Sequence, residues 1–472
     1  MAGLSSAASV PAVRVASEVG RPEETWLVGG AVRDLLQGKP VDDVDFATAS
    51  DPEPLARAMA AAVKGHVFPL SEKFGAWRVI APDRSWQADL TPLRGSSIDA
   101  DLALRDFTIN AMAWPPSGGE VIDHHGGIAD LDAGLLRAVG ERSFPDDPLR
   151  TMRMARFACE LGLSVEPGTR RMAAAHSPQI GSVSPERTFY ELVRLVCSPA
   201  PMRGVELMDE AGLVRELLPE LDALKGVEQN PYHHLDVWGH TLEVLEQVLG
   251  LESDLAAVFG DAAEGIAAQL QRSLADGMTR GQALRLGALL HDAGKPATQA
   301  VNDEGRILFW GHDAVGAQMS IDLVRRFRGS TALSSYLASL ARHHLVLGFM
   351  VREAPLSPGH VYRYLRATEP VELEVTLLSV ADRLATRGAR TRQEAIEAHL
   401  AVARELAAEA VRWRAAPPAP PLRGDELVRE LGIDSGPEVG RLLELLTEAV
   451  FAGRVSSRDE ALRLAADSVQ RT

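Results

Sequence analysis

The sequence predicts a small α/β domain with a mixed sheet, followed by a chain that is mostly helical. Short β-like runs, such as residues 67–70 and 74–80, occur only near the N-terminal end. Beyond about residue 141 these runs stop, and apolar residues recur with helical spacing. We expect four regions, namely a head at 23–140, a helical neck and body at 141–225, a third unit at 226–400 and a C-terminal helical arm at 401–472.

The stretch of residues 26–48 combines two chemical features in the order strand, turn, helix, strand. Gly29 and Gly30 lie between a short apolar run and a predicted helix, where glycine lets a phosphate approach backbone N–H groups closely. Asp43 and Asp45 follow in a predicted strand, so both carboxylates point to the same face. Paired carboxylates bind hard cations such as Mg²⁺. The stretch therefore predicts a phosphate site beside a metal site.

This arrangement resembles motif A of the nucleotidyltransferases related to DNA polymerase β. Within that group it resembles the class II tRNA nucleotidyltransferases and bacterial poly(A) polymerases. The resemblance implies that Asp43 and Asp45 are catalytic and bind Mg²⁺. It implies a third catalytic carboxylate just before a Thr-Pro-Leu-Arg-Gly sequence, which is Asp89 in this chain. The nucleotide-binding residues that it implies in the first motif are Gly29, Gly30 and Arg33.

A second matching stretch, residues 101–113, reads Asp-Leu-Ala-Leu-Arg-Asp-Phe-Thr-Ile-Asn-Ala-Met-Ala. It resembles a family motif with the core Arg-Arg-Asp-Phe-Thr-Ile-Asn-Ala, and Leu104 replaces the first arginine. Arg105 can bind a phosphate with its forked guanidinium, and Asp106 can accept a hydrogen bond from a ribose hydroxyl. With Asn110, these residues are expected to bind the nucleotide.

The helix expected after residue 145 carries a third motif. In the family, Glu-Asp-x-x-Arg recognises the nucleobase, and this chain has Asp146-Asp-Pro-Leu-Arg150. The resemblance implies that Asp147 accepts a hydrogen bond from the amino group of cytosine or adenine, while Arg150 donates to the ring edge. Arg153 and Arg156 continue the same helix face and are also expected to bind the nucleotide.

The formal net charge of −16 argues against binding of nucleic acid over the whole surface. A local basic stripe is sufficient, however, and we expect it along the neck, at Arg150 to Arg171, Arg187 and Arg194. Residues 184–194 resemble a further family motif, whose role is expected to be the bracing of the neck.

The third unit contains histidine and aspartate residues on separate predicted helices. Their order, with His-Asp-Ala-Gly-Lys-Pro behind an apolar run, resembles the HD superfamily of metal-dependent phosphohydrolases. Such side chains converging from several helices suit a divalent transition metal. Two questions stay open, namely whether the extra histidines bind a second metal and whether the site is idle. The expected ligands are His240, His291, Asp292, His312, His343 (or its neighbour His344) and Asp382.

Taken together, the resemblance implies a template-independent enzyme that adds CCA to tRNA 3′ ends from CTP and ATP, with a fused HD domain. The alternatives are a poly(A) polymerase, a partial enzyme that adds only CC or only A, and an HD phosphohydrolase with an RNA-binding head. Bacterial poly(A) polymerases typically carry a Gly-Arg-Arg-Phe-like segment near residues 74–80. This chain has Glu-Lys-Phe-Gly-Ala-Trp at 72–77, which favours the tRNA enzyme.

The remaining features concern location and the C-terminal end. No apolar run approaches the ~18 residues that a membrane span requires, and residues 1–20 lack a signal-peptide pattern. Cys159 and Cys197 are expected to be small buried residues, not disulfide partners. We therefore expect a cytoplasmic protein with no membrane partner. A stiff Pro-rich linker at 415–421 precedes residues 424–440, which resemble the C-terminal arm of tRNA nucleotidyltransferases or form a plain helix–turn–helix.

Overall fold

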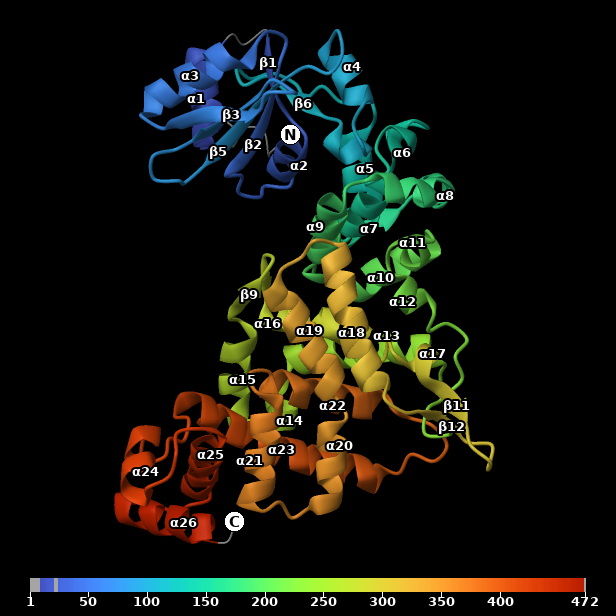
Figure 1. The fold of residues 1–472 in the computed structure, drawn as a ribbon. Helices are drawn as coiled ribbons and strands as arrows, with labels where there is room; N and C mark the ends of the chain where they lie inside the picture. The colour runs from blue at the N-terminus through green and yellow to red at the C-terminus, as the bar shows by residue number, and fades with distance from the viewer. Residues whose placement is uncertain (1–8, 21–23, 471–472) are drawn as a thin grey trace. The chain divides into compact units, whose positions relative to one another are not determined.

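The computed structural model describes residues 9–20 and 24–470, and the chain divides into two compact units, Met1–Leu217 and Leu218–Thr472. Position 23, where the predicted head begins, and residues 1–8 and 471–472 lie outside the described residues. The predicted fold class is confirmed, because a mixed sheet is followed by a mostly helical chain (Figure 1). None of the described helices is both long and apolar enough to cross a membrane.

The head is built on a six-stranded sheet with the strand order β3-β4-β5-β2-β1-β6. β2 and β5 pair in parallel, and the other neighbouring strands pair antiparallel, so the sheet is mixed. Its strands are β1 Thr25–Val28, β2 Asp43–Thr48, β3 His66–Ser71, β4 Ala76–Ile80, β5 Gln87–Pro92 and β6 Ala113–Trp114. The helices of the head are α1 Pro11–Val19, α2 Gly30–Leu36, α3 Pro52–Val63, α4 Ile98–Ala103 and α5 Gly127–Asp132, with the 3₁₀ turn η2 Thr108–Asn110.

The two faces of this sheet differ because side chains alternate along each strand. In β2, Val44 and Phe46 are fully buried in a core shared with α1, α2 and α3. Asp43 and Asp45 therefore point to the opposite face. The register pairs Asp45 with Asp89 of β5, which places this third acid on the same face. A slip of one residue would bury the acids instead, so the apolar core sets the position of the acidic face.

The neck continues the first unit with helices that pack on one another. α7 packs against α9 and α10, and Phe157 of α7 meets Phe107 of the head edge to face at 5.9 Å between ring centroids. Cys159 is buried as expected, Cys197 is only half-buried, and neither is part of a disulfide. The elements are α6 Ser143–Asp146, α7 Arg150–Leu161, α8 Pro167–His176, η3 Ser177–Ser182, α9 Pro185–Val196, α10 Pro201–Glu210 and α11 Leu213–Leu217, with the short parallel pair β7 Leu135–Leu136 and β8 Ser164–Val165.

The second unit is a helical body with two short β-hairpins. α13, α16, α18, α19 and α22 pack on one another, and α16 is almost wholly buried. Its elements up to the arm are α12 Pro219–Asp222, α13 Val237–Ser253, α14 Leu255–Phe259, η4 Gly260–Ala262, α15 Ala263–Leu270, β9 Ser273–Ala275, β10 Met278–Thr279, α16 Arg280–Leu290, α17 Lys295–Thr298, β11 Gln299–Val301, β12 Ile307–Phe309, α18 His312–Arg326, α19 Thr331–His343, α20 Val346–Met350, η5 Val351–Glu353, α21 Pro358–Thr368, α22 Glu372–Ala385 and α23 Gln393–Ala415.

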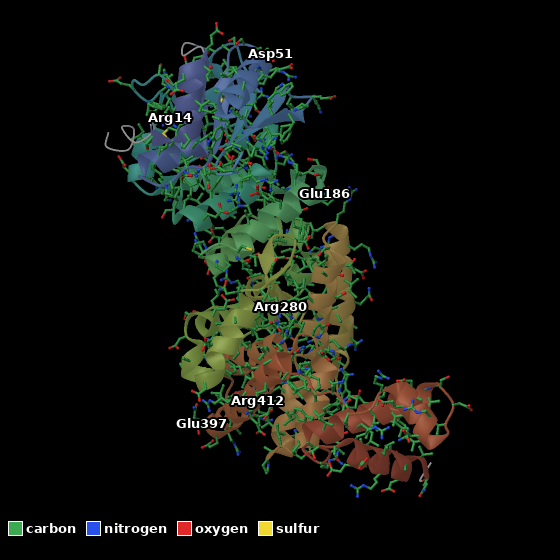
Figure 2. The ribbon with its side chains drawn as sticks, turned by 90° about the vertical axis from the view of Figure 1, so that its left-hand side faces the viewer. Arg14, Asp51, Glu186, Arg280, Glu397 and Arg412 are labelled. Carbon is green, nitrogen blue, oxygen red and sulfur yellow. The ribbon has the colours of Figure 1, made fainter. Side chains whose placement is uncertain are left out.

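The C-terminal arm has three helices with a small apolar core of their own, so it is larger than a plain helix–turn–helix. They are α24 Gly424–Leu431, α25 Pro437–Phe451 and α26 Arg458–Gln470. Glu444 of α25 accepts hydrogen bonds from Tyr362 and Arg366 of α21. Trp413 of α23, a helix that Figure 2 marks at Glu397 and Arg412, packs against Tyr362 and Phe451. These polar and aromatic contacts hold the arm against the body.

Gly294 allows the closest backbone approach near the predicted HD ligands. A Cβ atom there would lie 2.2 Å from the His312 carbonyl oxygen and 2.7 Å from the Gly316 nitrogen. We expect Gly294→Ala to destabilise the second unit by about 1–3 kcal/mol, because backbone atoms must move apart. The midpoint of thermal unfolding would measure this effect.

Gly250→Ala is the matched control, because Gly250 lies inside α13 with open space around its Cα. It should raise the stability by up to about 1 kcal/mol through helix propensity. Equal midpoints for the two variants would contradict the close packing of α17 on α18.

Candidate active site and metal centre

A cavity of about 520 Å³ in the first unit gathers nearly all the residues predicted to bind the nucleotide. The head contributes the Gly-Gly turn and the acids of β2, and the neck contributes arginines. The predicted residues that line it are Gly29, Gly30, Arg33, Asp43, Asp45, Arg105, Asp106, Asn110, Asp147, Arg150, Arg153 and Arg156. Among the described lining residues, Asp89 is absent.

The turn at Gly29 needs glycine for two reasons. Its φ of +73° lies in the left-handed region that side chains disfavour. A Cβ atom there would also lie 3.0 Å from Nη1 of Arg105 and 3.8 Å from Oδ2 of Asp45. Residues from two separate motifs therefore meet at one point, with a guanidinium directly over the turn, as phosphate binding requires.

Asp43 and Asp45 both open to this cavity. The surrounding protein excludes much of the water near Asp45 and raises the pKa of its carboxyl to about 6. The carboxylates of Asp89 and Asp43 act in the same direction, while Arg105 and Arg78 oppose them. A divalent cation at this point would relieve the repulsion between the acids, so the two side chains fit the predicted metal site.

Asp89 is held differently from the expectation. Arg78, its cross-strand neighbour in β4, donates to both carboxylate oxygens, with Nε–Oδ1 at 2.6 Å and Nη2–Oδ2 at 2.7 Å. As a third metal ligand Asp89 would have to share its carboxylate with Arg78, so that role stays a prediction. The antiparallel pairing of β4 and β5 brings Arg78 here, and sequence reasoning missed it.

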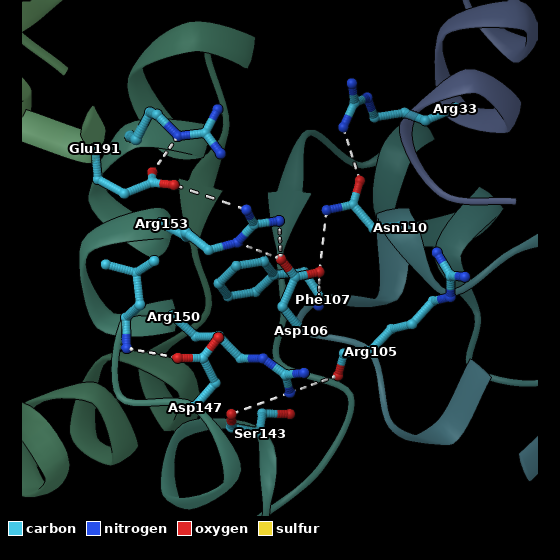
Figure 3. Close-up of polar contacts among 12 residues, drawn as sticks. Arg33, Arg105, Asp106, Phe107, Asn110, Ser143, Asp147, Arg150, Arg153 and Glu191 are labelled. Carbon is cyan, nitrogen blue, oxygen red and sulfur yellow. Dashed lines mark hydrogen bonds and ion pairs between the residues drawn. The ribbon is translucent and has the colours of Figure 1, made fainter. Parts of the chain in front are cut away.

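The Asp106 carboxylate is engaged by protein donors in this structure, so its contact with a ribose hydroxyl stays a prediction. Its carboxylate accepts hydrogen bonds from the Phe107 backbone, from Asn110 and twice from Arg153 (Figure 3). Burial would raise the pKa of Asp106, but Arg153, Asn110 and the Phe107 N–H hold it below its ordinary value. Asn110 in turn accepts from Arg33 at 2.7 Å. These residues form one buried network that joins the head to α7.

Arg150 is likewise engaged by groups of the protein. Its guanidinium is buried and donates to the backbone carbonyls of Arg105 and Ser143 at 3.1 Å (Figure 3). It also donates to the Leu104 carbonyl at 2.7 Å. These bonds use three of its five N–H donors, so a contact of Arg150 with the nucleobase stays a prediction. Arg150 braces the start of α7 in this structure.

Asp147 keeps an open carboxylate at the cavity wall. It accepts a hydrogen bond from the Leu149 N–H at 3.2 Å and from Nη2 of Arg187 at 2.9 Å. Arg187 belongs to α9 and was expected only to brace the neck, yet it lines the cavity. The pairing of Asp147 with an arginine agrees with its predicted function as a hydrogen-bond acceptor.

The other neck arginines differ in their exposure to solvent and in their ion-pair partners. Arg156 is only 2% exposed, pairs with Glu191 and Glu160, and lies 4.0 Å from the ring centroid of Phe157. Arg194, which pairs with Glu160, also lines the cavity and was not predicted to do so. The exposed part of the expected basic stripe thus includes Arg187 and Arg194 of α9 and Arg170 and Arg171 of α8.

The second unit brings the predicted HD residues together in two adjoining groups. One consists of His240 from α13, His291 after α16 and Asp382 from α22. The other consists of Asp292, His312 at the start of α18 and His344 after α19. In each group the candidate ligand atoms lie within 4.8 Å of one another.

Hydrogen bonds to backbone carbonyls orient three of these imidazoles. Nδ1 of His291, His312 and His344 lies 2.6–2.8 Å from the carbonyl oxygen three residues earlier, so each Nδ1–H donates and each Nε2 faces Asp292. The Nε2 atoms of His312 and His344 face each other at 3.3 Å. Burial lowers the pKa of His344 to about 4, so its lone pair is free at neutral pH. Converging acceptors of this kind fit a bound divalent cation.

His343 is not part of either group, which corrects the predicted ligand. It is half-buried beside Arg342, while the neighbouring His344 is buried in the cluster. The reason is the helical period, since His344 continues the buried positions Leu337 and Leu340 of α19. This register was visible in the sequence and could have decided between the two histidines.

The metal centre opens into a cavity of about 650 Å³ with cationic walls. Lys295 donates to Asp292 at 2.6 Å and, with Arg352 and Arg383, lines the same space. His233, which sequence reasoning missed, packs edge to face on His240 at 4.6 Å between ring centroids. Cations beside a metal centre suit an anionic substrate such as a phosphoester.

Comparison with known proteins identifies the chain. Family models described as "Poly A polymerase head domain", "Probable RNA and SrmB- binding site of polymerase A" and "HD domain" match residues 25–137, 162–225 and 237–387. An A-adding tRNA nucleotidyltransferase from Deinococcus radiodurans is 36% identical over 93% of this chain and 94% of its own length. The chain belongs to the tRNA nucleotidyltransferase family. A CC-adding member from Thermus thermophilus is 34% identical over 93% of this chain and 92% of its own length.

Solved structures agree with the fold of this tRNA nucleotidyltransferase. The Thermotoga maritima CCA-adding enzyme in complex with tRNA has a TM-score of 0.62 at 21% identity, covering 94% of this chain and 91% of its own. A CCA-adding enzyme with ATP has a TM-score of 0.65 at 20% identity, covering 97% and 94%. Both the nucleotidyltransferase head and the HD domain are metal-dependent domains.

The two adjacent histidines provide a direct test of the metal centre. We expect His344→Ala to lower the affinity for a divalent transition metal by more than the roughly 10- to 100-fold that loss of a residue orienting a ligand costs. His343→Ala should bind metal like the wild type. Equilibrium dialysis against Mn²⁺ or Ni²⁺ followed by elemental analysis measures both, and equal metal loss in the two variants would refute the ligand assignment.

Proposed function

We propose that this protein adds the nucleotides of the CCA sequence to tRNA 3′ ends, using CTP and ATP. The observation that carries the proposal is the cavity in which Gly29, Asp43, Asp45, Arg105 and Asp147 come together. It joins a phosphate site, a metal site and a base acceptor. The relatives that match along nearly their whole length are named for adding nucleotides to tRNA. The cytoplasm, where tRNA is processed, is the expected location.

The side chains of the cavity divide the reaction between them. Arg105, above the Gly29 turn, would bind the triphosphate, while the 3′ hydroxyl of tRNA attacks the α-phosphate and pyrophosphate leaves. Asp43 and Asp45 would hold Mg²⁺, which when bound supplies charge neutralisation and a lower pKa for the attacking hydroxyl. No covalent enzyme intermediate is needed.

Base choice is assigned to Asp147 in this proposal. Its carboxylate accepts hydrogen bonds, and cytosine and adenine both present an amino group where uracil and guanine present a carbonyl oxygen. In the free protein Arg187 occupies this acceptor. The incoming base would replace Arg187 as the partner of Asp147, so the pair is the point at which selection occurs.

A partial activity is the second candidate, because a specific observation favours it. The relatives named A-adding and CC-adding match over 93% of this chain, whereas the "Multifunctional CCA protein" of Halorhodospira halophila matches over 72%. Purified protein incubated with tRNA ending before CCA, after the first C or after CC, with each nucleotide in turn, separates these activities. Sequencing of the 3′ ends shows which nucleotides were added to which substrate.

The HD unit is proposed to be a separate phosphoester hydrolase with a divalent transition metal. His240, His291 and Asp382 of one group, with Asp292, His312 and His344 of the other, would hold the metal, which supplies an activated water when bound. The cavity and its cations Lys295, Arg352 and Arg383 support an anionic substrate. Failure of the metal-loaded protein to hydrolyse any phosphoester would leave the alternative of an idle module.

Loss of either acid of β2 should abolish nucleotide addition. We expect Asp43→Ala and Asp45→Ala to retain less than about a tenth of the wild-type rate, because a missing metal ligand costs several kcal/mol of transition-state stabilisation. Both side chains are exposed, so the fold should persist, which circular dichroism can check. Addition of labelled CTP and ATP measures the rate, and near-normal activity in either variant would exclude a shared metal.

Replacement of Asp147 should change selectivity, not only rate. We expect Asp147→Ala to lower CTP and ATP use and to raise the relative use of UTP and GTP, because an acceptor-to-acceptor mismatch of about 1–3 kcal/mol disappears. Asp146→Ala is the control, since Asp146 pairs with Arg142, and neither residue lines the described cavity wall. Competition assays with all four nucleotides measure the preference. An equal decrease for every nucleotide would place base selection elsewhere.

A further inference from the structure

One face of α9 carries an arrangement that the proposed reaction has not used. Arg187, Tyr190 and Arg194 are spaced by three and four residues, so they share one side of the helix. The opposite side, including Thr188, Leu192 and Leu195, is buried in the neck. Figure 2 labels Glu186 in the first turn of the same helix. The apolar side of α9 therefore fixes which three side chains point outward.

All three side chains are exposed to solvent. Tyr190 is 58% exposed, and the side chains of Arg187 and Arg194 are 55% and 42% exposed. Both arginines line the cavity, and the Arg194 guanidinium lies 5.8 Å from the centroid of the Tyr190 ring. The tyrosine thus lies beside one cavity-lining arginine, Arg194, and about one helical turn from the other, Arg187.

Both guanidinium groups retain donors for a ligand. Arg187 pairs with Asp147 through Nη2, and Arg194 pairs with Glu160 through Nε and Nη2. An arginine has five N–H donors, and these hydrogen bonds among the described residues use only some of them. Arg194 could therefore bind a phosphate while it stays paired with Glu160, and Arg187 could bind one with or without its bond to Asp147.

An aromatic ring between two arginines is the combination that binds single-stranded RNA. Bases stack on the ring face, and guanidinium groups bind the phosphates. The rest of the chain makes this location specific. The net charge is −16, and Arg150 and Arg156 of the neck are buried in internal contacts. RNA is therefore attracted where exposed arginines remain, which includes α9.

We propose that this face of α9, formed by Arg187, Tyr190 and Arg194, binds the 3′-terminal nucleotides of the RNA acceptor. A terminal base stacks on Tyr190, and the two arginines bind phosphates on either side. The inference rests on the proposed tRNA function. A template strand is absent from that reaction, so nothing but protein can hold the acceptor end beside the incoming nucleotide. The nucleotide itself uses the other wall, at Gly29, Arg105 and Asp147.

The test compares the KM for tRNA with the KM for the nucleotide in four variants. Tyr190→Ala should raise the KM for tRNA roughly 10-fold, the scale of one lost base stack, and leave the nucleotide KM unchanged. Tyr190→Phe keeps the ring and should behave like the wild type. Arg194→Gln should weaken tRNA binding and reduce the salt slope of log K by about 0.7, the value for one phosphate contact of a single strand. Arg203→Gln, an exposed arginine of α10 paired with Glu206 and Glu210, controls for loss of charge.

Each outcome decides between stated alternatives. An unchanged KM for tRNA in Tyr190→Ala overturns the inference while leaving nucleotide addition intact. A raised KM for the nucleotide, with that for tRNA unchanged, overturns it in favour of a nucleotide site on α9. If Arg203→Gln weakens tRNA binding as much as Arg194→Gln does, the loss reflects the net charge of the protein and not a site on α9. That result also overturns the inference. If the wild type adds nothing to any tRNA, the proposed function itself fails, and the two failures are thereby distinguished.

Discussion

The hydrogen bonds to the Asp106 carboxylate are the interaction on which the candidate active site depends. Through Arg153 they join the head to α7, and through Asn110 and Arg33 they reach the helix that follows the Gly-Gly turn. A buried carboxylate is stable only when its lone pairs are occupied. Asp106 therefore fixes the position of one cavity wall relative to the other. Because it serves as this brace, its carboxylate is already engaged by protein donors before a ribose could approach.

The arginines of the neck show how a chain with an excess of acids can have a basic active site. Several of them are neutralised within the protein, Arg150 by carbonyls and Arg156 by two glutamates. These charges stiffen the neck and contribute little to attraction of RNA. The arginines of α9 are paired with single carboxylates and stay exposed. The exposed arginines thus attract RNA, while the buried arginines of the same neck make the helices rigid.

The metal centre of the second unit is organised by backbone carbonyls. Each of three histidines donates Nδ1–H to the carbonyl three residues earlier, which fixes both the tautomer and the ring direction before any ion binds. The buried α16 positions His291 and Asp292 in the interior. Helix ends and a buried apolar helix therefore build a ligand set whose members are far apart in the sequence.

The sequence by itself determined the features that local patterning encodes. The alternation of β2 predicts that Asp43 and Asp45 share a face, and the glycine pair predicts the turn beside them, because both depend on neighbours in the chain. The role of Asp147 in base recognition, and the histidine and aspartate ligands on five segments, could be named only through resemblance to a family. Contacts between residues far apart in the chain could not be predicted in this way. The Arg78–Asp89 pair, the carbonyls around Arg150, the reach of Arg187 to Asp147 and the choice of His344 over His343 were decided by the tertiary structure. Each depends on which surfaces pack together, and a hydrogen bond between residues 40 positions apart leaves no trace in the spacing of either one.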